Sequence, residues 1–220
     1  MTKAIIYYTS NHEKPEFEER IRENILKQAG GIPIISVSQK PIDFGKNICV
    51  GDVGVSGFNM FRQVQIALQN TDADYVISAE ADCVYPPDYF QFEPYKLYMP
   101  FRNTNLYVMP DARDYFFYKG EGATHVQIVG RKHYLERLNT LFDGAPQWST
   151  EEKNFPRERG FGVDIFDKFE YFSTVNPVFQ IKTHKGMRYY TRSDRTPIPT
   201  LPYWGEGKKL RQYYLHGGNI

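Results

Sequence analysis

Residues 75–83 read Tyr-Val-Ile-Ser-Ala-Glu-Ala-Asp-Cys, an apolar strand pattern that ends in two acids. The two acids, Glu80 and Asp82, are two residues apart, so in an extended chain both side chains point to the same side. Hard cations such as Mn²⁺ and Mg²⁺ prefer oxygen ligands, and carboxylates together with substrate phosphates commonly hold Mg²⁺. The pattern therefore indicates a divalent-metal site at the end of a buried strand. For the pair taken alone, two acids that only keep a strand end soluble are an equally good interpretation.

Strand and helix patterns alternate ahead of this segment. Residues 4–8 and 32–37 are short apolar runs typical of buried strands, and residues 15–29 between them place apolar side chains at steps of four on one helical face. Ser56 can cap a second helix, which leads to the strand at residues 75–78. This βαβαβ order predicts a parallel sheet whose ligand crevice lies at the carboxyl ends of the strands.

The second half of the chain is less regular. We expect further strands and one helix, the helix at residues 132–141 and the strands at residues 106–109, 115–118, 126–129 and 178–181. Residues 144–162 are polar and rich in Pro and Gly, which is typical of a functional loop. Residues 183–220 show neither a helical nor a strand period, so we expect an irregular tail there.

The composition narrows the function classes. A chain of 220 residues fits one domain, and a formal net charge of +1 gives no global attraction to nucleic acid or to a membrane surface. No apolar run approaches the roughly 18 residues of a membrane span, and the start of the chain lacks a signal-peptide pattern. We therefore expect a soluble cytoplasmic protein with no membrane span, whose two cysteines, Cys49 and Cys83, are reduced thiols.

The order of these elements, the helix pattern at residues 56–63 and the run that ends in Glu80 and Asp82 resemble the nucleotide-binding half of GT-A glycosyltransferases of the family 2-like type. In that family a DXD motif ends a strand in this way and meets the metal and the sugar-nucleotide diphosphate. This chain has Glu-Ala-Asp instead. Because the last acid is the usual direct metal ligand in the family, the departure concerns Glu80 more than Asp82. The resemblance covers residues 4–90 well and the remainder loosely.

The resemblance implies an α/β fold of GT-A type, with a Rossmann-like mixed central sheet flanked by helices, in a single domain with an irregular C-terminal tail. Residues 1–182 would form the glycosyltransferase domain, with the nucleotide-binding half at residues 1–90 and the acceptor half at residues 91–182. Residues 183–220 would form a tail that completes or covers the active site. The implied enzyme is a metal-dependent hexosyl- or pentosyltransferase. It would move a sugar from a nucleotide-sugar, with a UDP-sugar as first choice, to a hydroxyl acceptor.

The same resemblance assigns residues to the site. Mn²⁺ or Mg²⁺ would be held by Asp82 and Glu80, with His184 as an additional ligand. The nucleotide-sugar would contact residues that follow the strands or begin the second helix: Tyr8, Thr9, Ser10, Asn11, Gly57, Arg62, Glu80 and Ala81. The cations Lys182, Lys185 and Arg188 would clamp the leaving diphosphate. For Arg62 and His184 the alternative is an ordinary surface residue.

An inverting transferase also needs a carboxylate that accepts the proton of the acceptor hydroxyl. Glu152 is the first choice, with Glu151 and Asp164 behind it, because they follow a strand and an Arg-containing turn as the acidic motif does in the family. The alternative for Glu151 and Glu152 is a pair of acids at a helix N-terminus. A retaining mechanism would need no such base, and both mechanisms stay open.

Two other function classes remain as alternatives. A nucleotidyltransferase would also use a Rossmann-like sheet and metal-binding acids, but residues 9–12 lack the Gly-rich, basic loop that usually follows its first strand. A non-catalytic nucleotide-binding module would bind a nucleoside diphosphate without transfer. The acceptor is unassigned: the cations and aromatic rings of residues 182–214 suit a phosphate-bearing acceptor, even a nucleic acid with a modified base. The more ordinary interpretation is a solvated tail whose cations face the sugar-nucleotide diphosphate.

Overall fold

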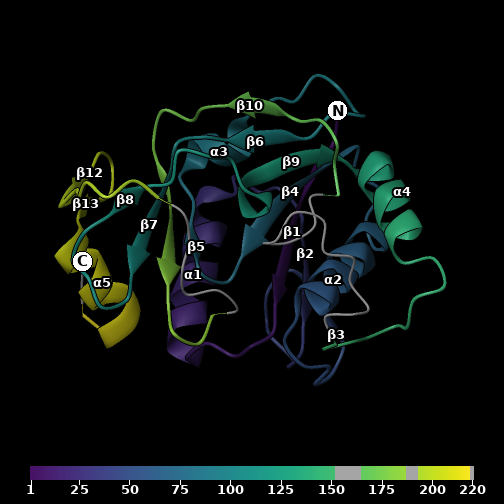
Figure 1. The fold of residues 1–220 in the computed structure, drawn as a ribbon, viewed down its shortest axis with the longest axis horizontal. Helices are drawn as coiled ribbons and strands as arrows, with labels where there is room; N and C mark the ends of the chain where they lie inside the picture. Colours follow the sequence, from purple (N-terminus) through teal and green to yellow (C-terminus); the bar gives the residue numbers. More distant parts are fainter. Residues whose placement is uncertain (152–164, 187–192, 219–220) are drawn as a thin grey trace.

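A seven-stranded mixed sheet organises the computed structural model, which describes residues 1–151, 165–186 and 193–218 (Figure 1). The strand order is β10-β6-β9-β4-β1-β2-β3. Adjacent strands from β4 to β3 pair in parallel, whereas β9 runs antiparallel to both β4 and β6. The bounds are β1 (Lys3–Thr9), β2 (Ile34–Ser38), β3 (Lys46–Cys49), β4 (Tyr75–Glu80), β6 (Phe101–Asn103), β9 (Gln127–Gly130) and β10 (Glu170–Phe172).

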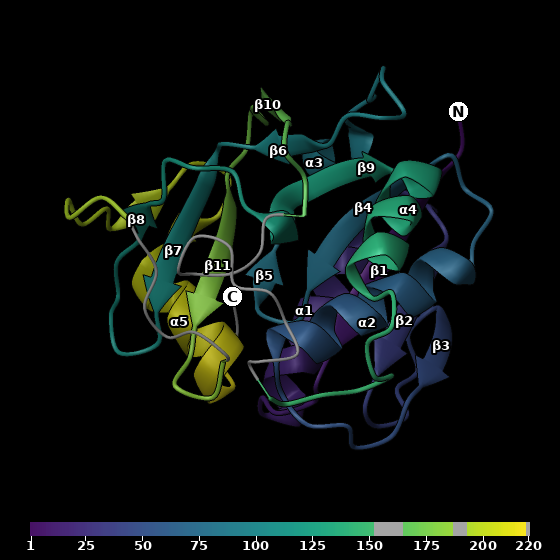
Figure 2. The same cartoon turned by 45° about the vertical axis from the view of Figure 1, so that its right-hand side comes forward.

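Helices cover both faces of this sheet because its central strands are apolar on both sides. Successive side chains of β1 alternate between two cores: Ile5 and Tyr7 pack with the apolar face of α1, and Ile6 and Tyr8 pack with the apolar faces of α2 and α4. Figure 2 shows α2 and α4 next to each other on one face of the sheet. The helices are α1 (Pro15–Gln28), α2 (Gly57–Gln69), α3 (Pro87–Gln91), α4 (Arg131–Leu141) and α5 (Gly207–His216), with a 3₁₀ turn η1 (Thr124–Val126).

A second, four-stranded sheet is connected to the first along the chain. Its order is β5-β11-β7-β8, and the chain enters it through the turn at residues 81–82, which joins β4 to β5. The strands are β5 (Cys83–Val84), β7 (Leu106–Pro110), β8 (Phe117–Tyr118) and β11 (Val178–Lys182). On one face of this sheet, the Phe179 ring contacts Trp204 and Tyr214 edge-on. The other face carries Gln180, which is therefore turned toward the first sheet.

The predicted fold class is confirmed. The structure is an α/β fold with a Rossmann-like mixed central sheet flanked by helices. Ser56 caps α2 as expected, since its hydroxyl accepts a hydrogen bond from the Asn59 amide at 3.0 Å. Both cysteines are free thiols, Cys49 exposed and Cys83 buried. Among the helices of the described residues, none combines the length and the apolar character needed to cross a bilayer.

The sequence pattern missed several short or polar strands. The edge strand β3 carries polar or half-exposed residues and has no apolar alternation that marks it as a strand. The strands β6 and β10 are three residues long, too short to show a period. Such strands form because a neighbouring strand already presents an open row of backbone hydrogen-bonding groups, which the sequence alone does not reveal.

The expectation of a tail without regular structure is corrected for residues 200–216. This stretch contains a two-stranded hairpin, β12 (Thr200–Leu201) with β13 (Gly205–Glu206), followed by α5. Leu210 and Tyr214, four residues apart, lie on the buried face of α5 within the same core as α1. Gly217 ends the helix in the left-handed conformation with φ 82°. The cations and tyrosines on the outer face of α5 obscured this helical period.

Replacement of Leu210 by alanine tests whether α5 belongs to the core. Leu210 is 2% exposed, and a buried Leu→Ala change costs about 2–5 kcal/mol of unfolding free energy because it leaves a cavity. The matched control is Lys208→Ala on the exposed face of the same helix, which should change the unfolding free energy by less than about 0.5 kcal/mol. Urea denaturation of both variants measures the difference. Equal, small effects would contradict the packing of α5 on the core.

Candidate active site

The sheet topology places a crevice between β1 and β4. From β1 the chain steps outward to β2 and β3, and α2 then carries it back across to β4 on the other side of β1. In open α/β sheets, ligands bind outside the carboxyl ends of the strands at such a point of reversal. Tyr8 and Glu80 face each other in the β1–β4 register at this end. The acids predicted from the sequence therefore lie at the position that the topology marks for a ligand.

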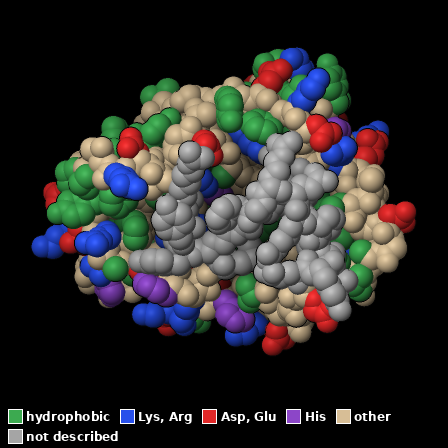
Figure 3. Space-filling model, viewed as in Figure 1, with side chains coloured by type: hydrophobic (Ala, Val, Ile, Leu, Met, Phe, Trp, Pro, Cys, Tyr) green, Lys and Arg blue, Asp and Glu red, His purple; other side chains and the backbone are tan. Residues whose placement is uncertain are grey.

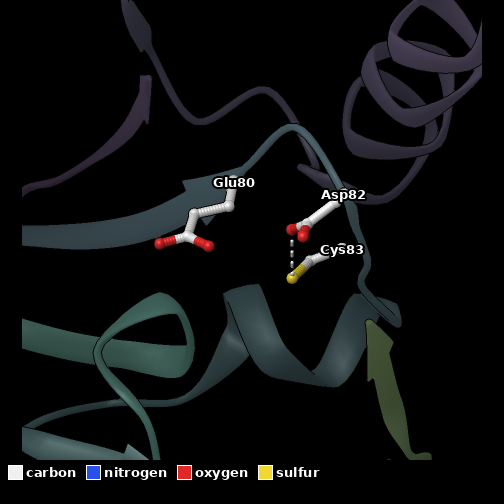
Figure 4. Close-up of side chains that lie close together, drawn as sticks. All are labelled: Glu80, Asp82 and Cys83. Carbon is white, nitrogen blue, oxygen red and sulfur yellow. Dashed lines mark hydrogen bonds between the residues drawn. The ribbon is translucent and has the colours of Figure 1, made fainter. Parts of the chain in front are cut away.

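The turn after β4 brings the two carboxylates together. Glu80 is the last residue of β4, and Asp82 lies in the turn that leads into β5 (Figure 4). Ligand atoms of Glu80, Asp82 and Cys83 all lie within 4.8 Å of one another. The Cys83 thiol is 3.3 Å from Asp82 Oδ1. The sequence predicted the convergence by strand alternation, whereas the turn produces it in the structure.

Gln180 on β11 fixes the Asp82 carboxylate. Its amide nitrogen Nε2 donates to both carboxylate oxygens, at 2.9 Å to Oδ2 and 3.1 Å to Oδ1. The backbone makes a parallel link, since the Ile181 amide donates to the Asp82 carbonyl at 2.8 Å. Gln180 is 2% exposed, and its carbonyl Oε1 is buried without a hydrogen-bond partner among the described residues. An unpartnered buried acceptor costs about 1–3 kcal/mol, so the orientation of this amide is set by its bond to Asp82.

Glu80 is held by two tyrosines. The Tyr8 hydroxyl donates to Glu80 Oε1 at 2.9 Å, and the Glu80 amide donates to the Tyr85 hydroxyl at 3.0 Å. Burial, followed by the nearby Asp82 charge, raises the pKa of Glu80 to about 7. The ammonium group of Lys182 and the Tyr8 hydrogen bond oppose this rise. The Glu80 carboxyl therefore lies close to the balance between its protonated and its charged form at neutral pH.

Two lysines complete the charge balance around the acids. Lys182 at the end of β11 and Lys119 after β8 both act electrostatically on Glu80. Burial and the charge of Lys182 lower the pKa of Lys119, and the negative charges of the acids oppose this decrease. The strand registers place Lys119 and Lys182 on the same face of the second sheet as Gln180, because residues opposite each other or two apart share a face. Lys119 was missed from the sequence: the strand before it was expected, but its position near the acids depends on pairing with strands distant in the chain.

The donor set fits a hard divalent cation. Two carboxylates offer oxygen ligands at close range, which is the chemistry that Mn²⁺ and Mg²⁺ require. Burial raises the pKa of the Cys83 thiol well above its usual range, so the sulfur is held protonated and does not add a soft thiolate ligand. Gln180 occupies one side of the Asp82 carboxylate and leaves each oxygen further lone pairs. The residues that would hold the cation are Asp82 and Glu80.

The polar side chains of the loop after β1 make hydrogen bonds within the protein. The Thr9 hydroxyl and the Asn11 amide nitrogen donate to the buried carboxylate of Glu18, at 2.9 and 3.2 Å. Asn11 also accepts from the Lys40 amide at 2.8 Å and adopts a left-handed conformation with φ 53°. Ser10 is half-buried between them. These contacts shape the floor of the crevice, and contact of this loop with a nucleotide remains a prediction.

Gly57 and Arg62 lie on α2 as expected, but Arg62 makes contacts within the protein. Its guanidinium lies over the Phe142 ring at 3.8 Å and donates to the carbonyls of Ala145 and Pro146. The side chain thus fixes the loop that follows α4, and contact of Arg62 with a nucleotide remains a prediction. Gly57 is the first residue of α2, with open space where a side chain would begin.

The predicted site residues at and after the end of β11 do not all lie at the acid pair. Lys182 joins the acid pair, whereas the exposed His184 pairs with Asp111, with Nδ1 3.1 Å from Oδ2. Within the described parts of the chain, the converging metal-ligand group does not include His184. Lys185 is exposed, and its charge acts on Glu13. Arg188 and the candidate bases Glu152 and Asp164 lie outside the described residues; the other candidate base, Glu151, is described and exposed.

Some of the cations in the C-terminal segment form ion pairs with nearby acids. Figure 3 shows Lys, Arg and His side chains gathered along the lower left of this face, in the region of α5. On that helix, Lys209 pairs with Glu206, and Arg211 pairs with Asp114 and donates to the Asp111 carbonyl. These pairings fix α5 to β13 and to the loop after β7.

Comparison with solved structures finds glycosyltransferases. The chain is similar to the glycosyltransferase GlyE of Streptococcus pneumoniae TIGR4 (16% identity, 78% of this chain and 45% of that chain, TM-score 0.49). It is also similar to TarS of S. aureus in complex with UDP-GlcNAc (11% identity, 86% and 62%, TM-score 0.46). A third match is a glycosyltransferase involved in the glycosylation of the major capsid of PBCV-1 (11% identity, 82% and 93%, TM-score 0.44).

The chain spans less than two thirds of the length of GlyE and of TarS. No protein-family model matches it, and no curated protein matches its sequence. Identities and TM-scores at this level assign neither a substrate nor an activity to this chain.

Replacement of Gln180 by methionine tests whether this residue positions Asp82. Methionine has a similar shape but no amide, so the carboxylate loses both hydrogen bonds from Gln180 Nε2, and the buried orphan oxygen is also removed. We expect the affinity for Mn²⁺ to fall by about 10- to 100-fold, as is usual when the partner of a metal ligand is removed. Isothermal titration calorimetry measures the affinity, and the control is Gln212→Met at an exposed position of α5. Unchanged Mn²⁺ affinity of the Gln180 variant would contradict the positioning role.

Proposed function

We propose that this protein is a metal-dependent glycosyltransferase that moves a sugar from a nucleotide-sugar donor to a hydroxyl acceptor. The single observation that carries the proposal is the convergence of Glu80 and Asp82 at the reversal point between β1 and β4. An acid pair at this edge suits a ligand that brings phosphates, because a divalent cation can link carboxylates to phosphate oxygens. The resemblance of residues 75–83 to the DXD segment of GT-A enzymes supports the same activity.

The charges around the acids suit departure of a nucleoside diphosphate. A bound cation neutralises the charge that develops on the leaving diphosphate. Lys182 and Lys119 are further positive groups at the same site, and their ammonium groups donate hydrogen bonds to phosphate oxygens in the proposed complex. Gln180 holds the Asp82 carboxylate in place through its hydrogen bonds, and Tyr8 holds the Glu80 carboxylate in the same way. Lys185 and Arg188 remain proposed as additional diphosphate contacts.

The finer assignments are part of the proposal. The donor of first choice is a UDP-sugar, and the cation is Mn²⁺ or Mg²⁺. In an inverting reaction Glu152, with Glu151 and Asp164 as alternatives, accepts the proton of the acceptor hydroxyl. A phosphate-bearing acceptor, including a nucleic acid with a modified base, and a cytoplasmic location are retained as hypotheses. A panel of UDP-, GDP-, CMP- and dTDP-sugars, tested for hydrolysis with and without Mn²⁺, identifies the donor.

Nucleoside diphosphate binding should depend on a divalent cation. Without the cation, the negative charge of the Asp82 and Glu80 carboxylates would oppose binding of the diphosphate; a cation held by these residues would offset that charge and attract the phosphates. Ligand at about 100 times its dissociation constant should add roughly 2.7 kcal/mol to the free energy of unfolding. Thermal unfolding with UDP and Mn²⁺, compared with UDP and EDTA, measures this effect. Equal stabilisation in EDTA would contradict the metal bridge.

Asp82→Asn should abolish sugar transfer and leave the fold intact. A neutral amide is a poor replacement for a carboxylate ligand of a hard cation, and its NH₂ group would also face the amide of Gln180. Asp72→Asn, on an exposed loop, is the matched control and should keep full activity. Transfer from the nucleotide-sugar is measured at limiting Mn²⁺, with circular dichroism as the check on folding. A fully active Asp82 variant would remove this acid pair from the proposed mechanism.

A nucleotidyltransferase is distinguished by its product. Such an enzyme would release inorganic pyrophosphate from a nucleoside triphosphate, whereas the proposed transferase releases a nucleoside diphosphate from a nucleotide-sugar. Detection of pyrophosphate release with nucleoside triphosphate and a sugar phosphate, without hydrolysis of any nucleotide-sugar, would favour that alternative.

A further inference from the structure

A hollow lies beside the N-terminus of α2, apart from the acid pair. Its volume is about 390 Å³, and it is lined by Val53, Pro146, Trp148, Ser149, Thr150 and Glu151. Two loops form it: residues 50–56, which follow β3, and residues 142–151, which follow α4. Trp148 is half-buried and is the one large aromatic side chain of the lining. The acids Glu80 and Asp82 are not among the residues that line it.

Hydrogen bonds build the hollow into the fold. The Ser56 hydroxyl donates to the Ser149 carbonyl at 2.6 Å, and the Ser149 amide donates to Asn59 Oδ1 at 2.8 Å. Arg62 holds the start of the same loop through the carbonyls of Ala145 and Pro146. The loop that carries Trp148 is therefore fixed to the first two turns of α2.

The opposite wall is fixed just as firmly. Asn59 Nδ2 donates to the carbonyls of Val53 and Gly54, at 2.6 and 3.1 Å. Gln39, directly after β2, donates to the Gly54 carbonyl at 2.9 Å and accepts from the Val53 amide. Gly54 has φ 80°, and a side chain there would meet Thr150 Cγ2 at 2.6 Å. Glycine at this position thus allows the two loops to approach each other.

The hollow and the acid pair lie on the same edge of the sheet. Gln63 on α2 donates to the carbonyls of Thr9 and Val37, which places the N-terminal part of α2 beyond the carboxyl ends of β1 and β2. Glu80 lies at the same end of β4, next to β1. Neighbouring strands are roughly 4.8 Å apart, so an edge from β4 to the β2–β3 side spans about 10–15 Å. An extended nucleoside diphosphate has a length of this order between its base and its terminal phosphate.

We propose that the Trp148 hollow binds the nucleobase of the donor, with the heterocycle stacked on the indole ring. The inference rests on the proposed function, which places the diphosphate at Glu80 and Asp82. An indole in a hollow with an apolar side chain, Val53, offers a stacking surface, and stacking tolerates any base because every base has a π-face. The loop after β1, expected from the sequence to meet the base, also hydrogen-bonds within the protein, to Glu18 and to the Lys40 amide.

Tryptophan fluorescence tests the proposal directly, because the chain has two tryptophans. Trp204 lies elsewhere, packed on Phe179 with its indole N–H donating to the Pro177 carbonyl. In the Trp204→Phe variant Trp148 is the remaining indole, so its emission reports on the hollow alone. We expect UDP and GDP with Mg²⁺ to quench this emission at the same concentrations at which calorimetry detects binding.

Trp148→Leu should weaken nucleoside diphosphate binding by roughly five- to 150-fold, the range measured when an aromatic stacking partner is removed. Trp148→Phe keeps a ring and should weaken binding less. Trp204→Phe is the control and should bind as the unchanged protein does. The free energy of unfolding of each variant, from urea denaturation, verifies that the fold persists.

The outcomes separate this inference from the proposed function. If UDP or GDP binds with Mg²⁺ by calorimetry but neither the Trp148 emission nor the affinity of Trp148→Leu changes, the base site is wrong and the transferase proposal stands. If no nucleoside diphosphate binds at any cation concentration, both fail. Quenching by free oligosaccharides but not by nucleosides would also overturn the inference and would assign the hollow to a sugar acceptor.

Discussion

The hydrogen bonds from the Gln180 amide to both oxygens of Asp82 join the two sheets of this protein at one point. The chain leaves the first sheet at Glu80 and enters the second at Cys83, so Asp82 lies in a turn of two residues between them. A turn with a charged side chain would be free to adopt several orientations in water. Gln180 from the middle of β11 removes that freedom and fixes one carboxylate where β4 ends.

The electrostatics of the site follow from its position between the sheets. Partial burial makes the charges of Glu80 and Asp82 costly, and the raised pKa of Glu80 reports that cost. Lys182 and Lys119 reduce it from the face of the second sheet. The two lysines offset part of the negative charge of the acids, and we propose that a cation and phosphates take over this role in the complex. That replacement needs little rearrangement, because Tyr8 and Gln180 hold the acids through hydrogen bonds that do not depend on the lysines.

The surrounding helices contribute by fixing loops. Arg62, expected to meet a nucleotide, lies over Phe142 and holds the loop after α4, while Ser56 and Asn59 hold its continuation at Ser149. The loop that carries Trp148 is thus fixed to the N-terminal part of α2, which lies at the same end of the strands as the acid pair.

The sequence by itself determined the order of β1, α1, β2, α2 and β4 and the place of the two acids, because period, capping and chain order are local properties. It did not reveal β3, β6 or β10, whose pairing depends on strands distant in the chain, or α5, whose buried face of Leu210 and Tyr214 is defined by α1. Only the tertiary structure shows that Gln180 and Lys119 lie near the acids. It also shows that His184 pairs with Asp111. The register of the second sheet decides these contacts, and no spacing in the sequence encodes it.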